Sequence, residues 1–239
     1  MVTGGASGIG EEIVRSFAVQ GSRVGFIDID ASRGAALEKD LRADGHTAAF
    51  YLCDLKDPEA LKDTVGRLVA AFGPVAVLVN NAANDDRHDW TEVTPAYFDE
   101  RIATNLRHFF FAIQAVAPGM IAAGKGSIIN LGSNSWWEAV GGMPVYVTAK
   151  AAVHGMTRSF ARDLGRHRIR VNTVVPGWVM TERQHQLWVT PEAIQRQLER
   201  QCLPDTVKPV NIARMVLFLA SDDAAMCTGN NYMVEGGSI

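Results

Sequence analysis

The sequence is poor in the features that mark secreted, metal-binding or membrane-embedded proteins. Its 239 residues include only three cysteines, Cys53, Cys202 and Cys227, which lie far apart. An odd number of isolated cysteines indicates free thiols in a reducing compartment, so we expect a cytoplasmic protein without a metal site. We find no signal peptide and no run that is long and apolar enough to cross a membrane, and we therefore expect no membrane partner.

An excess of charge of one sign is also missing. The chain has 23 Lys and Arg against 26 Asp and Glu, a formal net charge of −3. Without a basic stripe, a nucleic-acid partner is not expected. Hydrophobic residues make up 47% and charged residues 21%, which suits a globular chain that buries a full core. At this length we expect one domain over residues 1–239.

What the sequence does contain is a regular alternation of apolar runs and helical patterns. We expect strands at Arg23–Asp28, Thr47–Asp54, Val75–Ala82, Gly126–Ser133, Ile169–Gly177 and Asn231–Gly237. Nearly continuous apolar strands between helices are typical of a parallel sheet that is buried on both faces. We therefore predict a single-domain, doubly wound α/β fold of the Rossmann type with about seven strands. The first strand, before Thr3, is either very short or incomplete.

Helical patterns occupy the intervals between these runs. We expect helices directly after the first glycines and at Ser32–Asp44, Asp57–Phe72, Pro95–Ala123, Val145–Arg166 and Val210–Ala220. Asp57 and Pro58 are an N-cap and a first-turn proline that begin one of them. The segment Trp178–Pro209 interrupts the alternation. A long insertion after a strand is usually a lid or a substrate loop, and we expect this segment to be one.

The stretch "TGGASGIG", Thr3–Gly10, lies between the first strand and an amphipathic helix. Glycines allow close approach of a pyrophosphate to the backbone, and the helix N-terminus offers free N–H groups to it. Asp28 ends the next strand and could accept hydrogen bonds from ribose hydroxyls, which favours NAD over NADP. Arg33 leaves NADP possible. A plain tight turn and a helix-capping role for Asp28 remain open, although Asp30 is better placed as a cap.

A second stretch, "GSNSWWEAVGGMPVYVTAK", contains Ser133, Tyr146 and Lys150. A free phenol has a pKa of about 10, and a nearby ammonium lowers it. Residues four apart share one face of a helix, so Tyr146 and Lys150 would lie together. Ser133 could hold a substrate oxygen near the phenol. On spacing alone, a solvated helix face and a simple turn serine fit equally well.

Four motifs occur together and in order: Gly-x-x-x-Gly-x-Gly, "NNAA" at Asn80–Ala83, Tyr-x-x-x-Lys, and "PGWVMT" at Pro176–Thr181. Jointly they resemble the short-chain dehydrogenase/reductase family over nearly the whole chain. Ala83 replaces the glycine that usually ends the second motif, a change that should only tighten the local backbone. The resemblance implies an NAD(P)-dependent oxidoreductase that forms a homotetramer through its two long helices and the C-terminal strand region.

The resemblance also implies roles for individual residues. Tyr146 would be the general acid/base, Ser133 would orient the substrate, Lys150 would bind the nicotinamide ribose, and Asn105 would hold a water that links Lys150 to solvent. The cofactor-binding residues that it implies are Gly4, Ser7, Gly8, Ile9, Gly10, Asp28, Asp54, Leu55, Asn80, Ala82, Tyr146, Lys150, Pro176, Gly177, Val179 and Thr181. Taken singly, Asp54 could be a helix cap and Thr181 a turn hydroxyl.

The segments that follow the later strands are polar and rich in tryptophan, as in Asn84–Trp90, Asn134–Glu138 and Gly177–Trp188. Sugars suit this mixture, because hydroxyls need polar partners and C–H faces pack on aromatic rings, whereas an acyl or steroid pocket would be mostly apolar. The candidate substrate residues are Ser133, Asn134, Trp136, Tyr146, Trp178 and Arg183. Any of the tryptophans could instead fill the core.

Short motifs such as "NNAANDDRH" and "ASDDAAMCTG" are similar to those of the bacterial aldose 1-dehydrogenases. That similarity implies oxidation of the C1 hydroxyl of a cyclic sugar to a lactone. Two alternatives stay open. A 3-oxoacyl-carrier-protein reductase would share the fold and the catalytic residues but would favour NADPH, which Asp28 disfavours. A non-catalytic NAD-binding regulator would not need the full set of catalytic residues.

Overall fold

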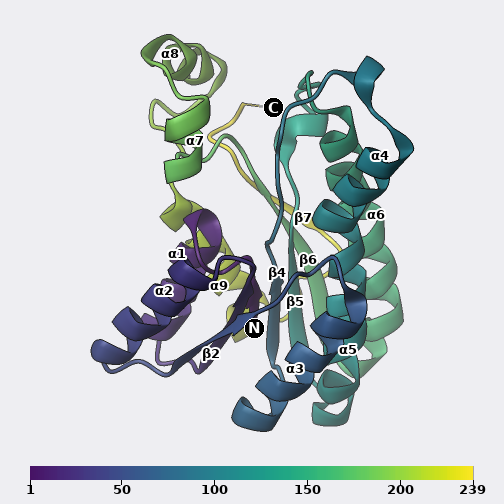
Figure 1. Cartoon of the computed structure of the whole chain (residues 1–239). Helices are drawn as coiled ribbons and strands as arrows, with labels where there is room; N and C mark the ends of the chain where they lie inside the picture. The colour runs from purple at the N-terminus through teal and green to yellow at the C-terminus, as the bar shows by residue number, and fades with distance from the viewer. Residues whose placement is uncertain (239) are drawn as a thin grey trace.

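The computed structural model describes residues 1–238 and contains a sheet of seven strands. The strands run in the order β3-β2-β1-β4-β5-β6-β7, and neighbouring strands are parallel (Figure 1). Their bounds are β1 Val2–Thr3, β2 Val24–Asp28, β3 Ala48–Leu52, β4 Val77–Asn80, β5 Gly126–Leu131, β6 Ile169–Pro176 and β7 Asn231–Val234. The order reverses between β1 and β4, where a doubly wound sheet forms its binding crevice. The predicted fold class is confirmed.

Helices cover both faces of this sheet (Figure 1). One face carries α1 (Gly8–Val19), α2 (Ala31–Ala43) and α9 (Pro209–Ala220), and the other carries α3 (Pro58–Phe72), α5 (His108–Ala123) and α6 (Pro144–Leu164). Successive side chains of a strand point to opposite faces, so adjacent residues of β2 enter different cores. Phe26 packs with the α1 and α9 core, and Ile27 with the α3 and α5 core.

The helical region from Pro95 to Ala123 corrects one sequence-based expectation. It is the one helix in residues 1–238 that is long and apolar enough to span a membrane by length and composition. In the fold it consists of α4 (Pro95–Ile102), a π-helical turn (Ala103–Arg107) and α5. Its apolar side chains Phe109, Ile113 and Met120 are completely buried. It is therefore a core helix.

The segment between β6 and α9 contains two short helices, α7 (Glu182–Leu187) and α8 (Pro191–Arg200). Figure 1 shows both projecting beyond the sheet on the side of α1. The Thr181 hydroxyl caps α7, and the Thr190 hydroxyl caps α8. A bridge between the buried residues Val179 and Val207 closes the base of the segment. The two ends of the insertion therefore pair with each other where it leaves and rejoins the fold.

Candidate active site

A cavity of about 850 Å³ lies at the carboxyl ends of the strands. The glycine loop, the segments after β2 to β6 and the first turn of α7 form its walls. Three residues that the sequence analysis selected do not line it: Asn80, Asn105 and Trp136. All the other selected residues do. The fold thus brings one large set together from segments that are far apart in the sequence.

The glycine loop requires glycine at Gly4, Gly8 and Gly10. Gly4 and Gly8 have positive φ angles of 63° and 58°, a region that side chains disfavour. A Cβ on Gly10 would lie 1.8 Å from the carbonyl oxygen of Gly4. The Asn81 side chain donates to that same oxygen at 2.9 Å and fixes the loop. The first turn of α1 opens into the cavity here, so the residues present fit a pyrophosphate.

Asp28 is held as an acceptor at the end of β2. Its Oδ2 accepts the backbone N–H of Ala6 at 2.9 Å, and its Oδ1 accepts that of Asp30 at 3.0 Å. A carboxylate has about four acceptor positions, so some remain for a ribose diol. Asp30, rather than Asp28, caps α2.

Arg33, a cation that lines the cavity near Asp28, is already paired. Its guanidinium lies 3.0 Å from the Glu182 carboxylate on α7 and 3.6 Å from that of Asp30. Arg33 and Glu182 both line the cavity. The cation that could receive a 2′-phosphate is therefore partly neutralised by a residue of the insertion.

Asn80 does not occupy the place expected for it. It is completely buried and donates to the side-chain oxygen of Asn130 at 2.9 Å, while its own Oδ1 has no hydrogen-bond partner. Asn81 lines the cavity instead. Asn80 ends β4 and points into the sheet, which puts its neighbour at the site. Ala82 lies where it was expected.

Tyr146 and Lys150 lie in the first two turns of α6, and both line the cavity. The Lys150 ammonium donates to the Leu131 carbonyl oxygen at 2.8 Å and lies 5.8 Å from the centroid of the Tyr146 ring. Burial lowers the pKa of Lys150 to about 7. Lys150 therefore carries a charge that the folded protein stabilises poorly near neutral pH.

The pKa of Tyr146 runs against the sequence-based expectation. Burial and the nearby Asp85 carboxylate raise it, while a hydrogen bond from Ser133 and the charge of Arg87 lower it by less. The expected lowering by Lys150 is not among these causes. Burial is the largest cause, because it removes the water that would stabilise the charge of the phenolate. Ser133 also exchanges hydrogen bonds with Ser135, at 2.9 Å and 3.1 Å.

Asn105 lies in the π-helical turn and is completely buried. Its side-chain amide donates to the Arg101 carbonyl at 2.9 Å, and its Oδ1 accepts the backbone N–H of Asn84 at 2.8 Å. The side chain thus ties the π-helical turn to the segment after β4. Turns of this kind occur frequently at functional sites.

Trp136 lies outside the cavity, contrary to the sequence-based selection. Its indole N–H donates to His154 Nε2 at 3.0 Å, and its ring stacks on Trp137 with centroids 3.6 Å apart. His154 Nδ1 pairs with the Asn231 side-chain oxygen at 2.6 Å. The two tryptophans therefore pack the loop after β5 against α6 and β7.

Other aromatic and polar side chains line the part of the cavity formed by the segments after β4 and β6, which we name the substrate end for the role expected of it. Trp178 and Trp188 line the cavity with Asp85, Arg183 and Gln184. The Trp178 indole donates to Gln184 at 2.8 Å, and Arg87 lies 5.2 Å from the Trp188 ring centroid. Asn81, Asp85, Gln184 and Trp188 line the cavity but are not among the site residues selected from the sequence. The "NNAA" motif contains Asn81, and the polar segments after the later strands contain the other three.

Comparison with known proteins agrees with this geometry. A family model described as enoyl-(acyl carrier protein) reductase matches residues 4–238. A D-xylose 1-dehydrogenase of Caulobacter vibrioides is 48% identical over 99% of this chain and 94% of its own length. A probable galactose dehydrogenase of Rhizobium meliloti is 45% identical over 99% of this chain and 93% of its own.

Among solved structures, a blue fluorescent protein from a metagenomic library in complex with NADPH superposes with a TM-score of 0.90. It is 36% identical, and the match covers 99% of this chain and 97% of that one. The family model spans almost the whole chain, and the two relatives approach half identity along its length. The chain belongs to the short-chain dehydrogenase/reductase family and is a dehydrogenase of that family.

Proposed function

We propose that the protein oxidises the C1 hydroxyl of a cyclic aldose to the lactone, with NAD as the preferred hydride acceptor. The observation that carries this proposal is the substrate end of the cavity, where two indoles and a set of charged and amide side chains lie near Tyr146 and Ser133. Hydroxyl groups need such polar partners, and sugar C–H faces pack on indoles. The two relatives named for xylose and galactose support the same substrate class.

In this proposal Tyr146 takes the proton of the anomeric hydroxyl. Ser133, which lines the cavity with Tyr146 and lowers its pKa, holds the oxygen that loses the proton. Lys150 is fixed by Leu131 beside Tyr146 and binds ribose hydroxyls. When bound, the oxidised dinucleotide supplies the hydride acceptor and a positive charge that favours a phenolate. Because the pKa of Tyr146 is raised, we expect turnover to increase with pH.

The preference for NAD rests on the ribose end of the cavity. Asp28 has acceptor positions left for a diol and a charge that repels a 2′-phosphate. Arg33 could offset that repulsion, but the carboxylates of Glu182 and Asp30 hold it. NADP is thus a possible but weaker cofactor.

The segment 178–209 acts as a lid over the single 1–239 domain. Phe110 on α5 is 45% exposed and packs on Phe160 of α6 with centroids 5.2 Å apart, an apolar patch suited to the contacts of a homotetramer. None of the three cysteines forms a disulfide, which fits a cytoplasmic enzyme.

The test is NADH formation on a panel of aldoses, uronates and acetoacetyl thioesters. Aldose-dependent NADH formation with lactone as the product is expected. Tyr146→Phe should reduce kcat by at least about a hundredfold, the lower range for a general base, while NAD still binds. Turnover confined to acetoacetyl substrates would show a 3-oxoacyl reductase instead. An inert wild type that still binds NAD would favour a regulator, and full activity in Tyr146→Phe would refute the mechanism.

A further inference from the structure

Hydrogen bonds anchor both ends of the segment after β4, residues 83–89. The backbone N–H of Asn84 donates to Asn105 at 2.8 Å, and that of His88 donates to the Gly142 carbonyl at 2.8 Å. Between these anchors the Asn84 side chain accepts the N–H of Asp86 at 2.9 Å. The hydroxyl of Tyr97 holds the His88 ring at 3.1 Å. Asp85 therefore stands on a positioned segment rather than on a free loop.

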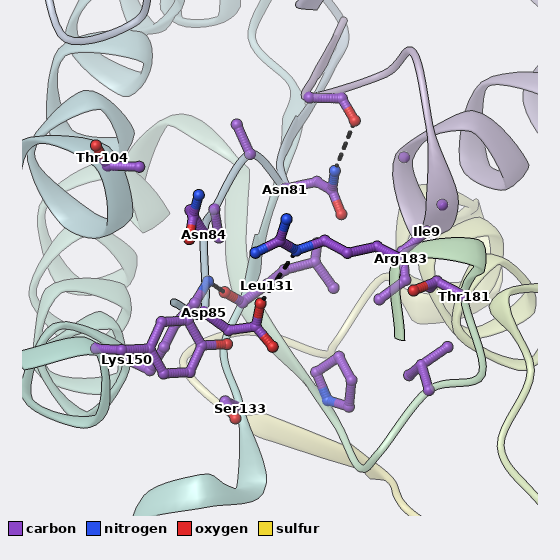
Figure 2. A pocket seen from close by; sticks show the side chains of 18 of the residues that line it. Ile9, Asn81, Asn84, Asp85, Thr104, Leu131, Ser133, Lys150, Thr181 and Arg183 are labelled. Atoms are coloured by element: carbon purple, nitrogen blue, oxygen red, sulfur yellow. Dashed lines mark hydrogen bonds and ion pairs between the residues drawn. The ribbon is translucent and has the colours of Figure 1, made fainter. Parts of the chain in front are cut away.

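The Asp85 carboxylate lies inside the cavity with its side chain 23% exposed. Gln184 Nε2 donates to its Oδ2 at 2.8 Å, and Arg183 Nε lies 3.5 Å from its Oδ1. Figure 2 shows the carboxylate between Arg183 on one side and Lys150 and Ser133 on the other. About four acceptor positions exist on a carboxylate, and the two partners, one of them distant, leave positions for substrate hydroxyls.

The negative charge of Asp85 makes it harder for Tyr146 to lose its proton and act as the base. Asp85 raises the pKa of Tyr146, while Arg87 lowers it, and Asp85 also opposes the lowering of the Lys150 pKa. The charged groups in contact with Asp85 or near it are Arg183, Arg87, Lys150 and the adjacent Asp86. A residue that works against the local chemistry is expected where it serves another function.

Asp86 provides a built-in comparison. Its carboxylate accepts the other end of the Arg183 guanidinium at 2.6 Å and also pairs with Arg101 at 3.2 Å. It tethers the same lid arginine as Asp85, but it does not line the cavity. A role in holding the lid would therefore be common to both residues, and contact with the substrate would belong to Asp85 alone.

We propose that Asp85 is the specificity residue of the substrate end, which binds hydroxyls of a neutral sugar and excludes sugars that carry a carboxylate. This inference rests on the proposed function. The fixed carboxylate supplies charge-assisted acceptors for the polyol and repels a second carboxylate, while Arg183 is held by Asp85 and Asp86 and cannot neutralise an incoming acid.

The experiment compares the wild type with Asp85→Asn and Asp86→Asn on D-galactose and D-galacturonate. Loss of a charge-assisted hydrogen bond predicts a rise in the KM for galactose of about ten- to hundredfold in Asp85→Asn. The preference in kcat/KM for galactose over galacturonate should fall by about tenfold or more, and the rising limb of kcat should move to lower pH. Asp86→Asn should change the KM less than about threefold, because Asp86 does not line the cavity and its pair with Arg183 is exposed to solvent.

Equal effects of the two substitutions would reduce Asp85 to a lid tether and overturn the inference, as would an unchanged galactose preference in Asp85→Asn. Thermal unfolding checks that each variant folds. If Asp85→Asn does not fold, Asp85→Ser replaces it, and Asp85→Glu should keep the exclusion of galacturonate while raising the KM for galactose. A wild type that oxidises no aldose would refute the proposed function, and a wild type that does so while Asp85→Asn keeps its selectivity would refute this inference alone.

Discussion

The two ends of the cavity are held together by different kinds of interaction. At the cofactor end the backbone itself forms the surface, and a single added Cβ on Gly10 would lie 1.8 Å from a carbonyl oxygen. Exposed side-chain pairs connect the insertion to the rest of the cavity, Arg183 with Asp86 at the substrate end and Arg33 with Glu182 near Asp28, and these side chains are 48% to 62% exposed. The glycine loop at the cofactor end is therefore fixed by steric contacts, whereas the insertion is held by solvent-exposed ion pairs.

This difference determines how each end responds to change. Because close-packed backbone has no room for an extra atom, a substitution in the glycine loop should either abolish cofactor binding or leave it almost unchanged. Exposed ion pairs contribute about 0–1 kcal/mol each, so substitutions there adjust function in small steps. We therefore expect cofactor binding to be lost abruptly and substrate selection to be changed gradually.

Gly10→Ala should give the largest effect. The new Cβ clashes with Gly4 and with the Asn81 amide, which lies 2.6 Å away, and such overpacking destabilises a fold by about 1–3 kcal/mol. Calorimetric titration should detect no NAD binding. The control is Gly66→Ala in α3, where a Cβ would meet nothing within 4 Å and where alanine should stabilise the helix by up to about 1 kcal/mol. Normal NAD affinity in Gly10→Ala would contradict the steric account.

Lys150→Met tests the buried ammonium where the two ends meet. Between about pH 7, the pKa in the fold, and the ordinary pKa of about 10.4, the unfolded chain binds a proton that the folded chain does not. Wild-type stability therefore rises with pH over this window, by up to about 1.4 kcal/mol per pH unit, and the variant lacks this contribution. The lost hydrogen bond to Leu131 adds only an offset that does not depend on pH.

Urea denaturation of the wild type and Lys150→Met at pH 7 and pH 9 measures this effect. The difference in unfolding free energy, wild type minus variant, should grow by about 1–2 kcal/mol in favour of the wild type at the higher pH. Parallel pH curves for the two proteins would show that Lys150 keeps its ordinary pKa. Activity should be absent in the variant at both pH values.

Asp28→Asn should have an intermediate effect, because it removes the charge at the cofactor end without removing the side chain. We expect the ratio of kcat/KM for NAD over NADP to fall about tenfold, the size of one charge-assisted contact. The matched control is Asp30→Asn, which removes a charge only two residues away from Asp28. Asp30 caps α2 and does not line the cavity. Asparagine is as good a cap, and Arg33 keeps its closer pair with Glu182, so that variant should shift the ratio only slightly toward NADP, through loss of the 3.6 Å pair of Asp30 with Arg33. An equal change in both would assign the preference to general charge.

Glu182→Gln should give the smallest effect. It breaks an exposed pair and frees Arg33 for a phosphate, so NADP should improve by no more than about fivefold, and high salt should reduce the difference from the wild type. The control is Glu59→Gln, whose lysine partner Lys62 lies 3.8 Å away on α3, outside the cavity. A loss of activity comparable to that of Gly10→Ala would contradict the contrast between the sterically fixed glycine loop and the exposed ion pairs of the insertion.

The sequence predicted the sheet well because apolar periodicity records burial. The expected strand Ile169–Gly177 is observed as Ile169–Pro176, and the expected helix Pro95–Ala123 has the observed bounds. The π-helical turn inside that helix was not predicted, since a register change in backbone hydrogen bonding leaves no mark on composition.

Predictions for the site were less complete where geometry depends on one residue of register or on distant contacts. Asn80 and Asn81 follow the same apolar run, and only the end of β4 decides that Asn81 reaches the cavity. Trp136 was selected but lies outside the cavity, whereas Trp188, which was not selected, reaches the site through the fold of α7. The contact of Arg183 with Asp85 joins residues 98 positions apart, which no local pattern encodes.

The stacked pair Trp136 and Trp137 has an optical consequence. Two indoles with centroids 3.6 Å apart and planes inclined by 28° couple their electronic transitions, so the loop after β5 carries its own circular-dichroism signal in the ultraviolet. The pair is tied through His154 to β7, and any rearrangement of this loop on binding sugar would change that signal without a label. Trp136→Phe should remove the couplet, and its persistence in that variant would show that the signal arises elsewhere.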